Sequence, residues 1–140
     1  MIESSFLPPD VSGLIAALAI GLLIGLERGW NDRELPEGSR VAGLRTFTLT
    51  GLLGGVLGHL QPNFGAWPLV AAVLGLSLLL TVSYARTAKI SGNLSATTII
   101  AMLLTLVLGA YASHGNVTLA LTAAVIVAVF LDLKPKLHSW

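Results

Sequence analysis

Apolar runs, each about as long as a helix that crosses a bilayer, dominate this chain. Five of them follow one another between polar connections, at residues 11–30, 41–60, 67–86, 94–111 and 117–133. A helix needs about 20 residues to cross the hydrocarbon, and its backbone must hydrogen-bond internally because lipid offers no partners. With 54% hydrophobic and 11% charged residues, the chain has too little polar surface to cover a soluble globule. We therefore predict an all-α, polytopic membrane bundle of about five helices, in one domain covering residues 1–140.

The basic residues all fall on one side of this predicted bundle. They lie around the first connection, in the third connection, or after the last apolar run. The eight are Arg28, Arg33, Arg40, Arg45, Arg86, Lys89, Lys134 and Lys136. Because basic residues are enriched in cytoplasmic segments, this distribution predicts an N-terminus outside the cell and a C-terminus in the cytoplasm.

Small residues recur every four positions along several of the predicted helices. Gly21, Gly25 and Gly29 form such a stripe on the first helix, and Gly51 and Gly55 begin one on the second. Stripes of this kind let helix backbones approach closely within a membrane. We predict glycine-zipper packing in a tight bundle with little room for a wide pore. The partner helix lies either in the same chain or in another protein, so a homodimer and a contact with another membrane protein stay open.

Ionisable and hydroxyl side chains gather near the predicted cytoplasmic ends of the helices. An ionisable group inside a span costs about 2.5–3.5 kcal/mol, so such groups are usually paired or face a cavity. Glu27 and Arg45 enter the membrane to similar depths from neighbouring helices, and we expect them to meet. The fourth helix begins at this level, where its free N–H groups favour an anion or a carboxylate. The predicted polar layer comprises Glu27, Arg28, Arg45, Thr46, Asn93, Ser95, Thr97, Thr98 and Asp132.

Two interpretations of this polar layer stay open. In the first, it binds an ion, a lipid head group or a partner helix. In the second, Glu27 and Arg45 form a structural pair, while Arg28, Lys134 and Asp132 extend toward water at the membrane interface. A Mg²⁺ site at Glu27 and Asp132 is disfavoured because nearby bases compete for both carboxylates.

Other kinds of chemistry find little support in the sequence. The absence of cysteine excludes disulfides and thiolate sites. His59 and His114 lie toward the outer ends of their helices, but two histidines without a third ligand are more typical of interfacial polar groups. No Ser-His-Asp or phosphate-loop spacing appears, and no basic stripe with stacking aromatics indicates nucleic-acid binding. We expect no enzymatic activity, no metal and no cofactor, with the lipid bilayer as a partner.

Four short motifs carry a family resemblance across the whole chain. They are GLLIGLER at residues 21–28, AGLRTF at 42–47, LSATT at 94–98 and LKPKLH at 133–138. In these motifs the chain resembles the MgtC/SapB family, in the branch where this domain begins a longer polytopic protein. The resemblance implies a helical domain of the bacterial inner membrane, with the Glu-Arg and Leu-Arg-Thr motifs carried by Glu27, Arg28, Arg45 and Thr46. Where the family pattern has an acidic residue in the fourth helix, this chain has Thr97 or Thr98.

The resemblance and the residues together lead to two functional hypotheses. Members of the family are linked to magnesium homeostasis and to restraint of the F-type ATP synthase, which implies a non-enzymatic regulator acting through helix–helix contacts. The alternative is a transporter or channel subunit for a small ion or solute. The one-sided charge argues against insertion of this chain in both orientations. An excised domain, a short paralogue and half of a split protein all remain open.

Overall fold

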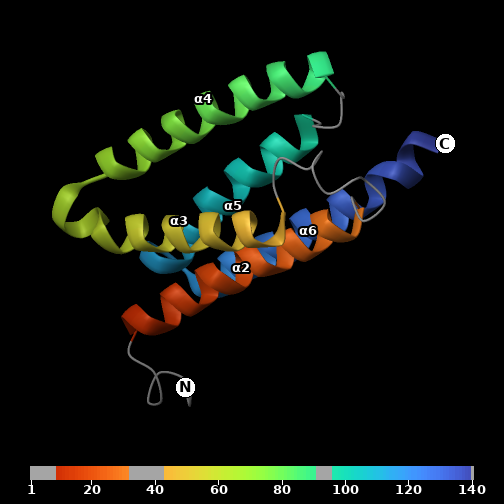
Figure 1. Cartoon of the computed structure of the whole chain (residues 1–140). Helices are drawn as coiled ribbons and strands as arrows, with labels where there is room; N and C mark the ends of the chain where they lie inside the picture. Colours follow the sequence, from red (N-terminus) through yellow and green to blue (C-terminus); the bar gives the residue numbers. More distant parts are fainter. Residues whose placement is uncertain (1–8, 32–42, 91–95, 140) are drawn as a thin grey trace.

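The computed structural model describes residues 9–31, 43–90 and 96–139, and every regular element among them is an α-helix (Figure 1). The helices are α2 (Pro9–Asn31), α3 (Leu44–Phe64), α4 (Trp67–Ile90), α5 (Ala96–His114) and α6 (Val117–Ser139). They alternate in direction, so α2, α4 and α6 run one way and α3 and α5 the other. The predicted all-α architecture is confirmed for the described part of the chain.

Two short connections produce this antiparallel order. Helix α3 continues four residues beyond its predicted end at Leu60, to Phe64, and the chain turns at Gly65. Gly65 has a φ of 72° and donates its N–H to the Gln61 carbonyl at 2.7 Å. A positive φ costs glycine little, and it ends the helix there. At the other connection, the Asn116 side-chain oxygen accepts the Leu119 N–H at 3.1 Å, which satisfies a free donor in the first turn of α6.

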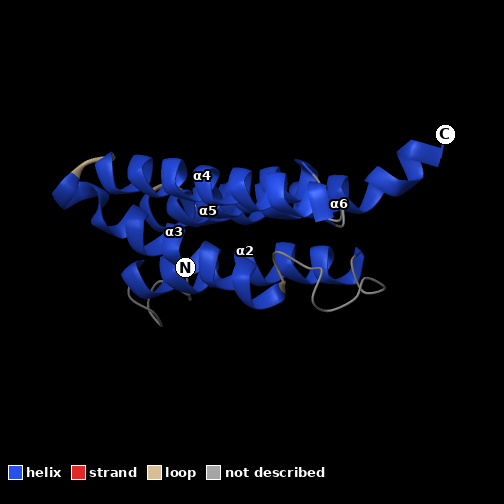
Figure 2. Cartoon of the chain, turned by 45° about the horizontal axis from the view of Figure 1, so that its top comes forward, coloured by secondary structure: helices blue, strands red, loops and turns tan. Residues whose placement is uncertain are grey.

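The core lies where α2, α3 and α5 meet. Its largest buried side chains are Ile20, Ile24, Phe47, Met102 and Leu106, each at most 1% exposed. Helix α6 packs on α2 and α5, whereas α4 contacts α3 and α5 from the edge of the bundle. In both cartoon views α4 lies on the side of the bundle away from α2 (Figures 1 and 2).

Small residues bring α2 and α3 into backbone contact. A Cβ added at Gly51 would lie 2.6 Å from the Ala17 carbonyl oxygen, closer than real Cβ atoms come. Gly51 therefore lets two helix backbones touch where a larger residue would separate them. Gly21, Gly25, Gly51 and Gly55 all lie at close contacts within the chain, whereas Gly29 has no atom within 4 Å of its Cβ position. These four glycines are thus used for packing inside one copy of the protein.

The outer surface of the described helices is largely apolar. Leu78 on α4 and Phe130 on α6 are 68% and 64% exposed, respectively. Two stretches are long and apolar enough to cross a membrane, Val11–Trp30 and Thr97–His114, and two shorter apolar stretches are Trp67–Ser83 and Val117–Asp132. Helix α3 falls in neither group. The exposed leucine and phenylalanine side chains suit contact with lipid tails rather than water.

Candidate functional site: the charged end of the bundle

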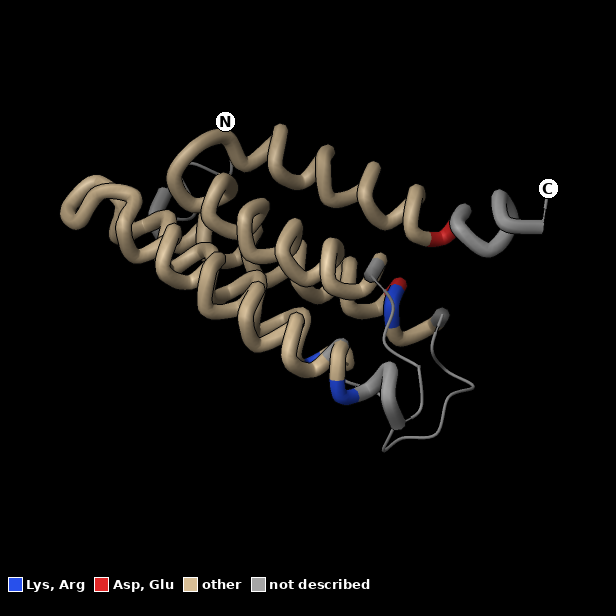
Figure 3. The backbone as a smooth tube through the Cα atoms, turned by 90° about the horizontal axis from the view of Figure 1, so that it is seen from above, with Lys and Arg blue, Asp and Glu red and all other residues tan. Residues whose placement is uncertain are grey.

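The Lys, Arg, Asp and Glu residues coloured in Figure 3 lie at one end of the bundle. Glu27 and Arg28 lie near the end of α2, Arg45 near the start of α3, Arg86 near the end of α4, and Asp132 in the second half of α6. Because successive helices alternate in direction, the last turns of α2, α4 and α6 come to the same end as the first turn of α3. Of these residues, Glu27, Arg28, Arg45 and Asp132 belong to the polar layer predicted from the sequence, and Arg86 does not.

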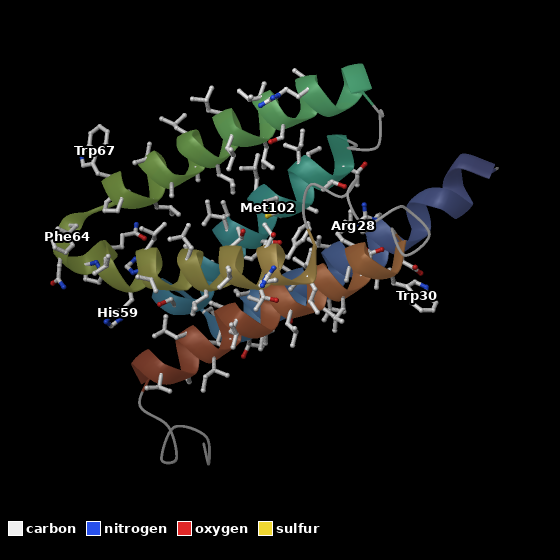
Figure 4. All side chains as sticks on the ribbon, viewed as in Figure 1. Arg28, Trp30, His59, Phe64, Trp67 and Met102 are labelled. Atoms are coloured by element: carbon white, nitrogen blue, oxygen red, sulfur yellow. The ribbon has the colours of Figure 1, made fainter. Side chains whose placement is uncertain are left out.

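Arg28 is the buried base at this end (Figure 4). Only 6% of the residue is exposed, and its guanidinium forms a forked ion pair with the carboxylate of the preceding residue, Glu27. Arg28 Nε donates to Glu27 Oε1 at 2.8 Å and Arg28 Nη2 donates to Oε2 at 3.3 Å. Two donors on one carboxylate fix the geometry of both side chains. The pair therefore keeps opposite charges together where water has little access.

Arg28 also connects α2 to α6. Its Nη2 donates to the backbone carbonyl of Leu131 at 3.4 Å. In a regular helix that carbonyl would accept the N–H four residues later, but the residue there is Pro135, which has no N–H. The proline thus leaves an unused acceptor on α6, and the guanidinium of Arg28 takes it. This contact explains why a positive charge is tolerated between two apolar helices.

Arg45 does not occupy the position that we expected. Glu27 forms its ion pair with Arg28, whereas Arg45 and its neighbour Thr46 are exposed. The reason lies in the rotation of α3, because Phe47 is fully buried. Residues two apart differ by about 200° around a helix, so burying Phe47 turns Arg45 outward. The expected meeting of Glu27 and Arg45 is therefore wrong, and the acid pairs with the base beside it.

The remaining predicted residues of the polar layer have different surroundings. Thr98 is buried and Thr97 half-buried in the first turn of α5, while Asp132 is exposed on α6. Asn93 and Ser95 lie outside the described residues. A buried contact that the sequence did not reveal joins Thr50 Oγ1 on α3 to the sulfur of Met102 on α5, at 3.2 Å.

A groove runs between α2 and α6 toward this charged end. It has a volume of about 470 Å³, and α2 and α6 contribute four residues each. Most of its surface is apolar, and the carboxylate-bearing side chains of Glu27 and Asp132 supply acidic groups to it. The lining residues are Leu23, Leu26, Glu27, Trp30, Val125, Ala128, Val129 and Asp132.

A smaller and more polar pocket lies at the opposite end, where Figure 4 places His59 far from Arg28. Its volume is about 280 Å³, and it is lined by Gly58, His59, Pro62, Asn63, Ser113 and His114. Ser113 Oγ is buried without a hydrogen-bond partner. Within the described residues, no group of three or more His, Cys, Asp or Glu side chains is placed to hold a metal. The two histidines share a pocket without forming a recognisable metal site.

The comparisons with known proteins identify the family. No curated protein and no solved structure matches the chain. The motifs of the sequence predicted a resemblance to MgtC/SapB proteins over the whole chain. A family model described as the MgtC family matches residues 14–140, so that prediction is confirmed and the chain belongs to the MgtC family of membrane proteins.

Proposed function

We propose that this chain is a multi-pass protein of the bacterial inner membrane, with all five described helices spanning and the charged end in the cytoplasm. The gathering of Arg28, Arg45 and Arg86 at one end supports this orientation, since basic residues accumulate on the cytoplasmic side. The N-terminus would then lie outside and the C-terminus inside. The apolar stretches of α4 and α6 are shorter than those of α2 and α5, but the outer faces of α4 and α6 are apolar, which supports their insertion in the bilayer.

The absence of cysteine makes this topology simple to test. Asn63→Cys and Arg45→Cys each place one thiol on an exposed residue, at opposite ends of α3. A maleimide that cannot cross the membrane should label Asn63→Cys in intact spheroplasts, and Arg45→Cys only after permeabilisation. Labelling of Arg45→Cys in intact spheroplasts, or equal labelling of both variants, would reverse or remove the proposed orientation.

We further propose that the protein is a non-enzymatic regulator that acts through helix–helix contacts with another membrane protein or a second copy. The observation that carries this proposal is the contrast between the interior and the surface. Gly21 of α2 and Gly51 of α3 are covered by each other's helix backbone, while large apolar side chains such as Leu74 and Leu78 of α4 are 65% and 68% exposed. A partner helix would therefore contact α4 or α6 rather than the glycine stripe. Magnesium homeostasis and restraint of the ATP synthase are the family-linked processes in which we place this regulator.

Crosslinking from the two kinds of surface tests this regulatory role. A photoreactive residue at position 78 on exposed α4 should give a specific crosslinked product in native membranes, and the ATP synthase and a second copy are the first candidates. The matched control is position 80 on the same helix, where Leu80 is only 3% exposed and faces the interior of the bundle, so it should give no product with a partner. If neither position yields a stable partner, and co-purification in mild detergent recovers none, regulation through helix contacts is contradicted.

A transporter or channel subunit for a small ion or solute is the second candidate. The groove between α2 and α6, with Glu27 and Asp132 in its lining, favours it because carboxylates near a cavity often mark ion paths. Purified protein in liposomes separates the two functions. Selective flux that disappears in Glu27→Gln or Asp132→Asn would favour transport, whereas sealed proteoliposomes without flux would favour regulation.

A further inference from the structure

The groove between α2 and α6 has walls with the same residue spacing. Each helix contributes positions i, i+3, i+4 and i+7 of one face: Leu23, Leu26, Glu27 and Trp30 from α2, and Val125, Ala128, Val129 and Asp132 from α6. Both helices run in the same direction, so the two series progress side by side toward the charged end. Seven residues of helix rise about 10 Å, so the groove is about two turns long.

Polarity changes along this groove in one direction. Leu23 and Val125 begin the two series away from the charged end, and they offer only hydrocarbon. Glu27, Trp30 and Asp132 lie at or near the charged end. Tryptophan is enriched at the level of lipid head groups, so Trp30 marks that end as interfacial. A ligand that fits this groove is apolar over most of its length and polar at one end, as a phospholipid is.

The charges at the polar end select the head group. Among the described residues of the lining, Glu27 and Asp132 are the ionisable ones, and both are acids. The nearby base, Arg28, is buried and directed to Glu27 and to the Leu131 carbonyl, and it does not line the groove. An anionic head group would therefore meet carboxylates, while a choline head group has no N–H to donate. A primary ammonium group both complements the charge and donates hydrogen bonds to carboxylate oxygens.

We propose that this groove binds one phospholipid with a primary ammonium head group, of the phosphatidylethanolamine class. One acyl chain lies along the apolar walls from Leu23 and Val125, and the ammonium group contacts the carboxylates of Glu27 and Asp132. Asp132 is exposed, so its carboxylate can be reached by a ligand in the groove. The proposal rests on the proposed insertion of α2 and α6 in the bilayer, but it holds whether the protein regulates a partner or transports a solute.

Native mass spectrometry of the purified protein tests the head-group preference. The protein is released from nanodiscs that contain phosphatidylethanolamine, phosphatidylcholine and phosphatidylglycerol in equal parts, and the retained lipids are counted. We expect one phosphatidylethanolamine to be retained about tenfold more often than either other lipid, the ratio that one charge-assisted hydrogen bond supplies. Asp132→Asn should lower that preference by about three- to tenfold, whereas Arg45→Gln, which alters an exposed charge outside the groove, should leave it unchanged.

A second pair of variants tests the position of the acyl chain without altering charge. Val129→Phe fills the groove from α6, while Ile126→Phe adds the same ring to a residue of the same helix that does not line the groove; the two are 50% and 51% exposed. Retention of lipid should fall in Val129→Phe and persist in Ile126→Phe. Equal retention of all three head groups, a preference for phosphatidylglycerol, or unchanged binding in Val129→Phe would overturn the proposal. A lipid-free dimer that Val129→Phe disrupts would also overturn it, in favour of a second copy in the groove. The cysteine-labelling result identifies separately any failure of the proposed topology.

Discussion

Replacing Arg28 with methionine should destabilise the protein strongly. The guanidinium makes three hydrogen bonds, two to Glu27 at 2.8 and 3.3 Å and one to the Leu131 carbonyl at 3.4 Å. The side chains of the ion pair are only 7% and 10% exposed, so methionine would leave a carboxylate in a site with little water. Removing one partner of a buried pair typically costs about 3–5 kcal/mol. We expect Arg28→Met to lower the free energy of unfolding by an amount in this range.

The double variant makes this prediction specific to the pair. In Glu27→Gln/Arg28→Met the buried carboxylate is removed together with its base, and replacement of a whole buried ion pair is often close to neutral, so most of the lost stability should return. Arg45→Met is the matched control, since Arg45 is exposed at the same end and surface substitutions usually change stability by about 0.5 kcal/mol or less. Equilibrium unfolding in mixed micelles, followed by circular dichroism, measures all three. If Arg28→Met and Arg45→Met lose equal stability, the buried-pair explanation fails.

Three further predictions concern the contacts around this pair and in the core. Pro135→Ala supplies an N–H that competes for the carbonyl four residues earlier, so the unfolding cost of Arg28→Met should fall by about 1 kcal/mol in that background; an unchanged cost in this double-mutant cycle would refute the competition. Gly54→Ala forces a methyl group onto the backbone of α5 and should destabilise by about 1–3 kcal/mol, whereas Gly75→Ala, with open space around it, should stabilise by up to about 1 kcal/mol; equal effects on thermal unfolding would contradict the close contact. Ser113→Ala removes a buried hydroxyl that has no hydrogen-bond partner, so the free energy of unfolding should stay the same or rise. A decrease of more than about 1 kcal/mol in thermal unfolding would show that the hydroxyl is hydrogen-bonded in the native protein.

The order and approximate length of the helices could be predicted from the spacing of the apolar runs in the sequence. Runs of about 20 apolar residues separated by turn-forming residues gave the five described helices and their alternation. The ends were less accurate, and α3 passes its predicted end at Leu60 and reaches Phe64. Pro62 lies in that last turn, where we expected a connection, but the positive φ of Gly65 is what ends the helix.

The rotation of each helix about its axis was the main feature that apolar length could not predict. A sequence that is apolar on all sides of a helix does not show which face turns inward, so Glu27 was matched with Arg45 by their depth in the membrane alone. The glycines indicate which face of each helix turns inward. Phe47 lies four residues before Gly51, on the same face of α3, and Arg45 lies six residues before it, on another face. If the glycines of α3 are taken to pack against a helix of the same chain, Arg45 is predicted on the exposed face of α3.

The same reasoning on α2 explains why Arg28, and not Arg45, is the buried base. Arg28 follows Gly25 by three residues and Gly21 by seven, so it continues the face on which these glycines approach neighbouring helices. A charge on that face must find an acceptor within the protein, and the carbonyl freed by Pro135 in α6 provides one. Because Arg28 contacts the α6 backbone at this level, we expect its loss to change the spacing of the two walls of the groove. Arg28→Met should therefore alter lipid retention even when Asp132 is intact.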